Sequence, residues 1–262
     1  MKKIYIHTDL EGISGIGDGD MVKVDSPDVR YCNERLMMDI NAAIDGAFAG
    51  GANHVTVLDM HRGGGNFDLN LLDKRAEFDT NPNGKWWGIL DDSYWGSFFI
   101  GAHAMPGTIN GFLDHAIDSN TILNFSFNGR RVGELGMWAA VCGHFNVPLI
   151  MVSGDEAAVN EATQLFGDIE IAAVKRGISR GKARLKDNGE ALDDIRQAAK
   201  RAVEKEYVIK PYKPILPLDI RIDFTRSDHC ESWLYMCEKL ERLDARSAHM
   251  VVNDYKDIVI WC

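Results

Sequence analysis

The sequence predicts an α/β fold, with a mostly parallel sheet flanked by helices and a small C-terminal strand-helix-strand domain. Over residues 3–60, a strand pattern, a long amphipathic helix pattern and a second strand pattern follow one another. Residues 147–152 form a continuous apolar run, which is typical of an interior parallel strand. Prolines at 211, 214 and 217 mark an extended connector. We therefore expect a larger domain over residues 1–210 and a small α/β domain over residues 211–262.

The first strand-helix-strand unit has the clearest pattern. Lys3–Thr8 is rich in β-branched and aromatic side chains, which predicts a strand. Apolar residues recur at three- and four-residue spacing over residues 29–49 and predict a helix, which Gly50-Gly51 ends. Residues 54–60 predict the second strand. Because such crossover connections are right-handed and return in the same direction, the two strands should be parallel.

The remaining elements follow from the same periodicities. Between residues 62 and 92 we expect loops around one short helix near residues 69–76. After that we expect strands at 97–101, 147–152 and 169–174, a hairpin arm at 123–127 that turns at Asn128-Gly129, and helices at 132–144, 155–164 and 186–205. Beyond the prolines we expect a strand at 218–224, a helix at 227–240 with Ser227 as N-cap, and a strand at 248–253.

The composition argues against nucleic acid or a membrane as a partner. Among 262 residues, 29 are Lys or Arg and 39 are Asp or Glu, which gives a net charge of −10. This balance leaves no broad basic face for phosphates and repels an anionic membrane surface. Only a few residues separate Lys2 and Lys3 from Asp9, too few for a signal-peptide apolar stretch, so we expect a cytoplasmic protein. The cysteines at 32, 142, 230, 237 and 262 have no C-x-x-C spacing and are expected to stay reduced.

Two carboxylates stand where the first predicted strand ends. Asp9 and Glu11 are two residues apart, and in an extended chain such residues point to the same side. Two negative charges held close together repel each other unless a positive group lies between them, and a divalent cation is a common solution. The alternative is that both are solvated loop carboxylates.

Metal-capable residues also end two other predicted strands. Asp59 and His61 follow the second strand, and His103 follows Ser97–Gly101. Ligands of parallel α/β sheets collect outside the carboxyl ends of the strands. A single histidine in such a place is commonly just hydrogen-bonded at the edge of the core. Three strand ends with carboxylate and imidazole side chains favour a metal site instead.

Two further residues extend this pattern. Glu134 lies near the predicted start of an apolar helix, where a carboxylate also interacts well with the helix dipole. As a ligand it would complete a set that suits zinc better than calcium: Asp9, Glu11, His61, His103 and Glu134. His115, twelve residues beyond His103, is open to three interpretations: a further ligand, a general acid–base group or a surface imidazole.

Several short motifs occur in order along the chain: Asp9-Leu10-Glu11-Gly12-Ile13-Ser14-Gly15, Asp59-Met60-His61, Gly101-Ala102-His103-Ala104, Val132-Gly133-Glu134-Leu135-Gly136 and Ala172-Ala173-Val174-Lys175. Together they resemble the zinc D-aminopeptidase family, peptidase family M55. The resemblance runs over roughly residues 1–185 and is weak beyond them.

This resemblance implies a site and a reaction. It implies two Zn²⁺ per chain, with Mn²⁺ or Co²⁺ as alternatives, in which Asp9 bridges the ions and Glu11, His61, His103 and Glu134 complete their ligands. It implies His115 as the catalytic histidine and a metal-bound hydroxide as the nucleophile. The expected reaction is release of an N-terminal residue, a D-amino acid such as D-Ala, from short peptides. The expected assembly is a ring-shaped homo-oligomer, with a decamer as one size considered.

Three other functions compete with this hypothesis. A related metal-dependent amidohydrolase would act on L-peptides or on a non-peptide amide. A metal-dependent phosphoesterase would need cationic side chains for phosphate, and only Lys175, Arg176 and Arg180 keep it open. A non-catalytic oligomer that binds a small ligand would need the same pocket without turnover.

Overall fold

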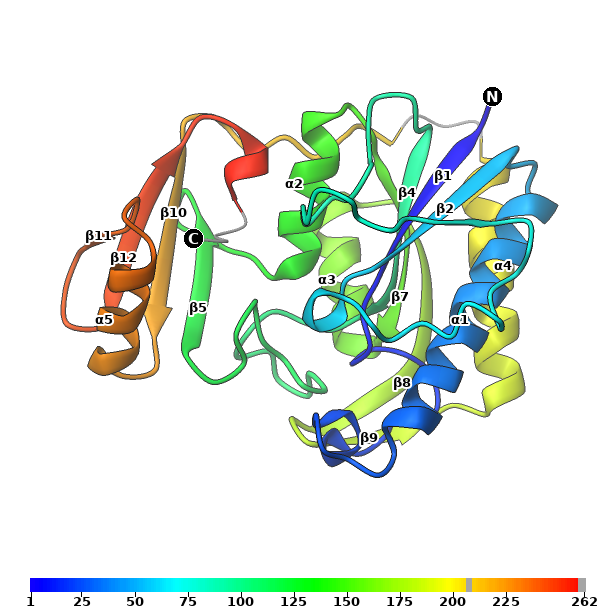
Figure 1. Cartoon of the computed structure of the whole chain (residues 1–262), viewed down its shortest axis with the longest axis horizontal. Coiled ribbons are helices and arrows are strands. Elements are labelled where there is room, and N and C mark those ends of the chain that lie inside the picture. Colours follow the sequence, from blue (N-terminus) through cyan, green and yellow to red (C-terminus); the bar gives the residue numbers. More distant parts are fainter. Residues whose placement is uncertain (206–208, 259–262) are drawn as a thin grey trace.

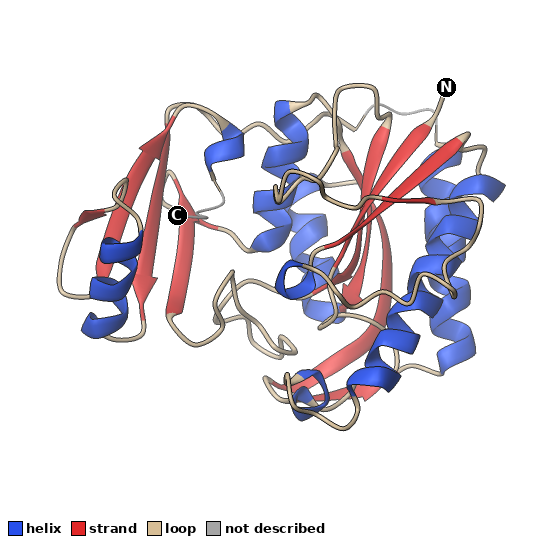
Figure 2. Ribbon diagram, viewed as in Figure 1, coloured by secondary structure: helices blue, strands red, loops and turns tan. Residues whose placement is uncertain are grey.

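The computed structural model describes residues 1–205 and 209–258, and they form two sheets with helices between and around them (Figure 2). Sheet A has seven strands: β1 (Lys3–Thr8), β2 (His54–Asp59), β3 (Glu77–Phe78), β4 (Gly96–Ala102), β7 (Leu149–Asp155), β8 (Glu170–Ser179) and β9 (Lys182–Leu185). Their order is β3-β2-β1-β4-β7-β8-β9, and every pairing is parallel except that of β8 with β9. The predicted parallel α/β fold is therefore confirmed.

Helices cover both faces of sheet A (Figure 1). The four helices are α1 (Val29–Ala49), α2 (Glu134–His144), α3 (Glu156–Phe166) and α4 (Asn188–Glu204). Side chains that alternate along β1 explain how both faces are filled, because successive residues of a strand point to opposite sides. Ile4 and Ile6 pack in one core cluster with α1 and α4, whereas Tyr5 packs in the other with α2.

Sheet B is antiparallel and lies beyond α2 (Figure 1). Its strands are β5 (Ile122–Phe127), β6 (Arg130–Arg131), β10 (Leu218–Phe224), β11 (Glu241–Arg242) and β12 (Ser247–Val252), in the order β11-β12-β10-β5-β6, and helix α5 (Ser227–Met236) packs on it. Strands β5 and β6 precede the prolines, so this sheet takes strands from both sides of residue 210. Its apolar residues share one core cluster with α2. The domain boundary at 210/211 stays a prediction.

Two predicted elements differ from the structure. Residues 69–76 are turns rather than a helix, since the Asn41 side chain of α1 donates to the carbonyl of Leu71 and accepts from the N–H of Asp73. Such side-chain hydrogen bonds replace those a helix would make. Helix α5 ends at Met236 rather than at 240, and its N-cap is Arg226 instead of Ser227 because Arg226 is the extended residue there.

The cysteines and the surface add two further observations. Cys32, Cys142 and Cys230 are buried free thiols, but Cys237 is disulfide-bonded, so the expectation of reduced cysteines is wrong for this residue. C-x-x-C spacing relates only cysteines that are close in sequence. Cys262 lies outside the described residues. Across residues 1–205 and 209–258, no helix is both long and apolar enough to cross a membrane. A cytoplasmic location stays a prediction.

The strand order places a crevice beside β1. The chain leaves β1 through α1 to β2 on one side and later returns to β4 on the other side. At such a switch point, the loops after neighbouring strands turn apart and leave space at the carboxyl ends, where ligands of α/β sheets bind. Asp9 and Glu11 follow β1, His61 follows β2 and His103 follows β4.

Candidate metal centre

A cavity of about 400 Å³ opens at these strand ends. Asp9, Glu11, His61, His115 and Glu134 all line it. His103 lies behind them with a fully buried side chain. The structure thus brings together all six of the residues that the sequence singled out as ligands or as the catalytic histidine. The cavity is large enough for a small peptide or a similar ligand.

Asp9 lies at the centre of the cluster. Its Oδ1 is 2.9 Å from Nδ1 of His61, and its Oδ2 is 3.3 Å from Nε2 of His103. Glu11 reaches the same His61 nitrogen, with 3.0 Å from Oε2 to Nδ1. The two oxygens of one carboxylate therefore face two different groups of side chains.

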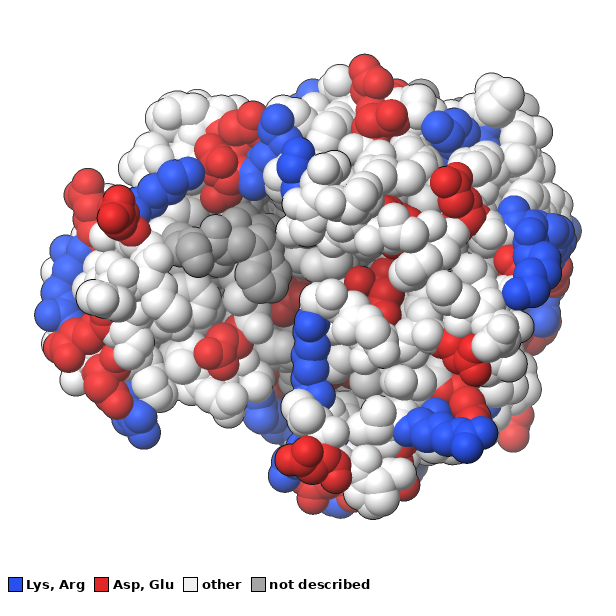
Figure 3. Space-filling model, in the orientation of Figure 1, with Lys and Arg blue, Asp and Glu red and all other residues white. Residues whose placement is uncertain are grey.

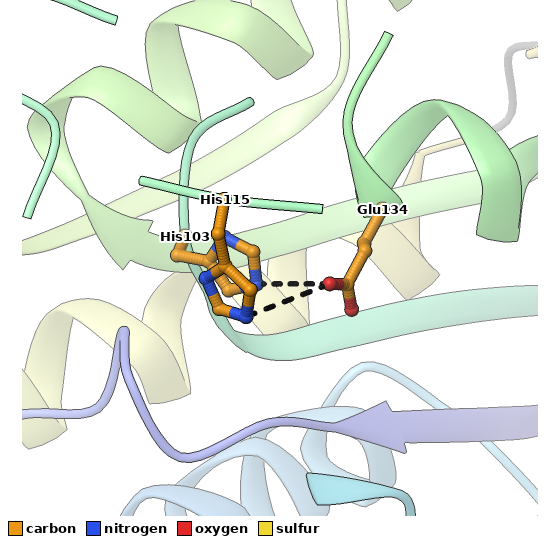
Figure 4. Close-up of side chains that lie close together, drawn as sticks. All are labelled: His103, His115 and Glu134. Carbon is orange, nitrogen blue, oxygen red and sulfur yellow. Dashed lines mark ion pairs between the residues drawn. The ribbon is translucent and has the colours of Figure 1, made fainter. Parts of the chain in front are cut away.

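The second group consists of His103, His115 and Glu134 (Figure 4). Oε1 of Glu134 lies 3.4 Å from Nε2 of His103 and 3.8 Å from Nε2 of His115. The two imidazole rings stack, with centroids 3.9 Å apart and planes inclined by 11°. The N–H of His115 donates to the carbonyl of Ala104, which turns the loop back so that the rings meet.

Backbone carbonyls orient both rings of this pair. Nδ1 of His103 lies 3.2 Å from the carbonyl oxygen of Ala104, and Nδ1 of His115 lies 2.7 Å from that of Leu113. These contacts assign the proton to Nδ1, because a carbonyl can only accept it. Nε2 of each ring is left facing Glu134, which is the arrangement that a metal-binding or proton-accepting nitrogen requires.

Asp59 does not join the cluster, although its spacing from His61 resembles that of Asp9 from Glu11. The chain leaves the extended conformation at Met60, with φ −120° and ψ −9°, so residues 59 and 61 no longer share a side. The Asp59 carboxylate instead accepts hydrogen bonds from both the backbone and side-chain N–H groups of Asn66 and from the N–H of Phe67. It fixes the loop that carries His61.

Close backbone packing places the loop after β1 directly against β4. A Cβ on Gly12 would lie 2.0 Å from the carbonyl oxygen of Ala102, and one on Gly101 would lie 2.0 Å from that of Asp9. Gly101 also has φ +83°, a conformation that glycine adopts without strain. The N–H of Gly12 donates to the carbonyl of Gly101 at 2.8 Å. These contacts bring Asp9 and His103 together from separate strands.

A buried lysine also anchors the loop that follows β1. Nζ of Lys175, on β8, donates to the carbonyls of Glu11, Ile13 and Ile16 at 2.5, 2.8 and 2.9 Å. The side chain is almost completely buried and lies 4.4 Å from the ring centroid of Phe112. Its three ammonium hydrogens are matched by three carbonyls, so each polar group is satisfied without water.

The carboxylates of the cluster favour the protonated, positively charged form of the neighbouring histidines. Burial alone would lower the pKa of His61, but Glu11 and Asp9 outweigh it and raise the pKa to about 10. Burial also lowers the pKa of His103, but Glu134 and Asp9 outweigh it and raise the pKa well above its usual value. Burial raises the pKa of Glu11 and Glu134, yet the neighbouring imidazoles lower both. Without a metal, protons on His61 and His103 balance the carboxylates.

The donor set fits two cations. Nε2 of His61 and Nε2 of His103 are buried and form no hydrogen bond within the described residues, although carboxylate oxygens lie 3.3–3.4 Å from Nε2 of His103. Leaving such an atom unpaired costs about 1–3 kcal/mol, and a metal ion in contact with it would remove that cost. Two clusters within the described residues have the composition of a metal site, Asp9-Glu11-His61 and His103-His115-Glu134. Imidazole with carboxylate oxygen suits zinc and similar transition metals.

Sequence reasoning did not identify several residues of this cavity. His7 stacks on Trp138 at 4.2 Å, and its burial lowers its pKa to about 3, so it stays neutral. Trp86 and Arg62 also line the cavity. Nothing in the spacing indicated His7 or Arg62, whereas Trp86 belongs to a group of aromatic residues that could line a pocket or pack in the core. Lys175 belonged to a recognised motif, but its contact with Glu11 required the tertiary structure.

Comparisons with known proteins agree with one another. The sequence model of peptidase family M55, described as D-aminopeptidase, matches residues 1–262, including the C-terminal part where the motifs were weak. A D-aminopeptidase of Bacillus subtilis is 35% identical over 217 residues, which cover 81% of this chain and 77% of that protein. The solved structure of the Zn-dependent D-aminopeptidase DppA from Bacillus subtilis, a self-compartmentalizing protease, matches with a TM-score of 0.91 and 28% identity, over 98% of this chain and 93% of the other.

Zinc binding should release protons. Because the pKa of His61 is raised to about 10 and that of His103 is also raised, both rings hold an extra proton near neutral pH, which a metal must displace. We expect release of roughly two protons per chain at about pH 7.5, measured by calorimetry in buffers of different ionisation enthalpy. His61→Gln should release about one fewer, whereas His249→Gln, outside the cavity, should match the wild type. Binding without proton release would contradict this charge balance.

Removal of the Lys175 ammonium should loosen the loop that carries Glu11. Lys175→Met leaves three buried carbonyls unpaired, so we expect the free energy of unfolding to fall by about 3 kcal/mol, measured by chemical denaturation. Zinc should also bind more weakly to the folded variant. Lys182→Met, at a solvent-exposed lysine of β9, should change neither property. Unchanged zinc affinity in folded Lys175→Met would mean that other contacts position the loop.

Proposed function

The chain belongs to peptidase family M55, the D-aminopeptidases, and from this premise we propose that it is a binuclear zinc aminopeptidase. Its substrates are short peptides, from which it releases the N-terminal D-amino acid, such as D-Ala. The observation that carries the proposal is the position of Asp9, whose two carboxylate oxygens face His61 on one side and His103 on the other. A carboxylate shared in this way is what a pair of neighbouring ions needs.

Each ion has three protein ligands in this proposal. Asp9, Glu11 and His61 would hold one ion, and Asp9, His103 and Glu134 would hold the other. Three protein ligands leave a position for water or substrate, which is the pattern of catalytic rather than structural zinc sites. Bound zinc would supply Lewis-acid polarisation of a carbonyl and a water molecule of lowered pKa. Zinc is preferred because the similar structure is Zn-dependent, with Mn²⁺ or Co²⁺ as substitutes.

The chain's own residues supply binding and proton transfer. The carboxylates of Glu11 and Glu134 border the cavity and attract the free ammonium group of a peptide. His115 is only partly buried, and Nδ1 of its ring is tied to a backbone carbonyl. Since the other five residues already provide three ligands to each ion, we assign His115 to proton transfer onto the leaving amine.

The three cations that the sequence offered for phosphate do not support a phosphoesterase. Lys175 is buried under the loop with all three hydrogens used. Arg176 pairs with Glu156 and Arg180 with Asp114, and none of these three cations lines the cavity. On the face shown in Figure 3, Lys and Arg are scattered among Asp and Glu without a continuous basic area.

An oligomer follows as part of the proposal. The similar solved structure is that of a self-compartmentalizing protease, which encloses its active sites within its own assembly. We infer that this chain forms a homo-oligomeric ring with an inner chamber, and a decamer is one size compatible with that inference. An enclosed chamber would restrict substrates to short peptides, in keeping with a cavity of about 400 Å³.

Chirality distinguishes the proposed reaction from its alternatives. We expect the zinc-loaded protein to hydrolyse D-Ala-D-Ala with a kcat/KM about 100-fold or more above that for L-Ala-L-Ala, because a shaped pocket beside fixed ions accepts one enantiomer. Release of free alanine, followed by chromatography, measures both rates. A preference for L-Ala-L-Ala would favour an L-peptidase on this scaffold. Zinc binding without hydrolysis of any peptide or amide would favour the ligand-binding oligomer.

His115→Ala tests the proton-transfer assignment. We expect kcat for D-Ala-D-Ala to fall by about 10²–10⁴-fold, because general acid catalysis is lost, while two zinc ions per chain remain bound. Metal analysis and steady-state kinetics on the same sample measure both. His229→Ala, on α5 and outside the cavity, should behave as the wild type. Loss of one zinc would make His115 a ligand, and unchanged kcat would remove it from the mechanism.

A further inference from the structure

Arg62 is a cationic side chain that lines the cavity together with the carboxylates. Apart from the histidines, it is the only basic residue among the described residues that line this cavity. A short unmodified peptide carries a positive amine at one end and a negative carboxylate at the other. In the metal-loaded site the cations would balance the carboxylates, so Arg62 is the group whose charge complements the negative end of the peptide, and this contact would give orientation as well as attraction.

The backbone around Arg62 is fixed before any ligand binds. Arg62 has φ 52° and ψ 30°, a left-handed conformation that is uncommon for a residue with a side chain and is often found at functional sites. The loop that imposes it is held by the hydrogen bonds of the Asp59 carboxylate to Asn66 and Phe67. Nδ2 of Asn66 also donates to the carbonyl of His61 at 2.8 Å. Arg62 is therefore joined rigidly to a residue of the proposed metal centre.

The guanidinium group of Arg62 is oriented but not neutralised. Its Nη2 donates to the carbonyl of Val22 at 2.7 Å, and no carboxylate within residues 1–205 and 209–258 forms an ion pair with it. Asp118, which also lines the cavity, is occupied by the N–H groups of Asn120 and Thr121 and by the Thr121 hydroxyl. The remaining N–H groups of the arginine are available for a ligand in the geometry that a carboxylate accepts.

We propose that Arg62 binds the terminal carboxylate of the substrate and thereby selects short peptides with a free C-terminus. This inference rests on the proposed function, because the amine and the first carbonyl must lie at the metal centre for the carboxylate to reach the arginine. One residue of extended chain spans about 3.3–3.6 Å, so a dipeptide or tripeptide fits a cavity of this size. Peptide amides lack the terminal carboxylate, and longer chains would place it outside the cavity.

Paired substrates that differ only in charge test the proposal. We expect the wild type to hydrolyse D-Ala-D-Ala with a kcat/KM about 10- to 100-fold higher than that for its C-terminal amide, because the charge-assisted hydrogen bonds are absent in the amide. Arg62→Met should lower kcat/KM for D-Ala-D-Ala by a similar factor, mostly through KM, and leave the amide unaffected. Arg62→Lys should retain part of the preference, since a lysine keeps the charge but not the bidentate geometry.

Controls separate this role from a structural one. Arg30→Met removes a solvent-exposed arginine of α1 and should keep the full preference for the free acid. Zinc content measured on every variant confirms that the metal centre is intact. Equal losses for acid and amide in Arg62→Met, or no loss for the acid, would overturn the assignment of Arg62 and leave the proposed function standing. A zinc-loaded wild type that hydrolyses neither substrate would overturn both.

Discussion

Three carboxylates share one small cavity, and the balance of their charge is the constraint on which the rest of the site depends. Asp9, Glu11 and Glu134 are mostly withdrawn from water, where like charges repel strongly. Two imidazoles at 2.9–3.4 Å carry the compensating protons in the absence of metal. A pair of divalent cations would replace those protons and satisfy the buried atoms that have no partner.

The scaffold supplies the forces that hold this arrangement. Strand order opens a crevice between β1 and β4, and glycine contacts let the two loops approach within hydrogen-bond distance. Lys175 then ties the β1 loop to β8 through three carbonyls. Asp59 performs a comparable role for the loop after β2. Lys175 and Asp59 hold the loops but are not members of the cluster, so the side chains that face the cavity remain free for a ligand.

The sequence predicted the parts of this protein that depend on local periodicity. The α/β fold and the parallel pairing of β1 with β2 followed from alternating and helical spacing, and the strand-end rule gathered Asp9, Glu11, His61 and His103 at one edge. The spacing of Asp59 from His61 repeats that of Asp9 from Glu11, but Met60 leaves the extended conformation, so Asp59 lies apart from the cluster. It also did not indicate the stack of His103 on His115, which depends on a loop that folds back through one backbone hydrogen bond. Sheet B joins β5 to strands almost a hundred residues further along the chain, a pairing that local patterns cannot predict.

A zinc titration of chelator-treated protein, with the wild type beside Asp9→Ala, tests directly whether Asp9 is shared by two metal ions. We expect two equivalents of zinc per chain for the wild type, and both should bind more weakly in Asp9→Ala because one carboxylate serves both ions. Asp118→Asn, which removes a carboxylate charge from the same cavity but outside the cluster, should bind as the wild type does. A single equivalent in the wild type, or the loss of only one ion in Asp9→Ala, would contradict a binuclear centre bridged by Asp9.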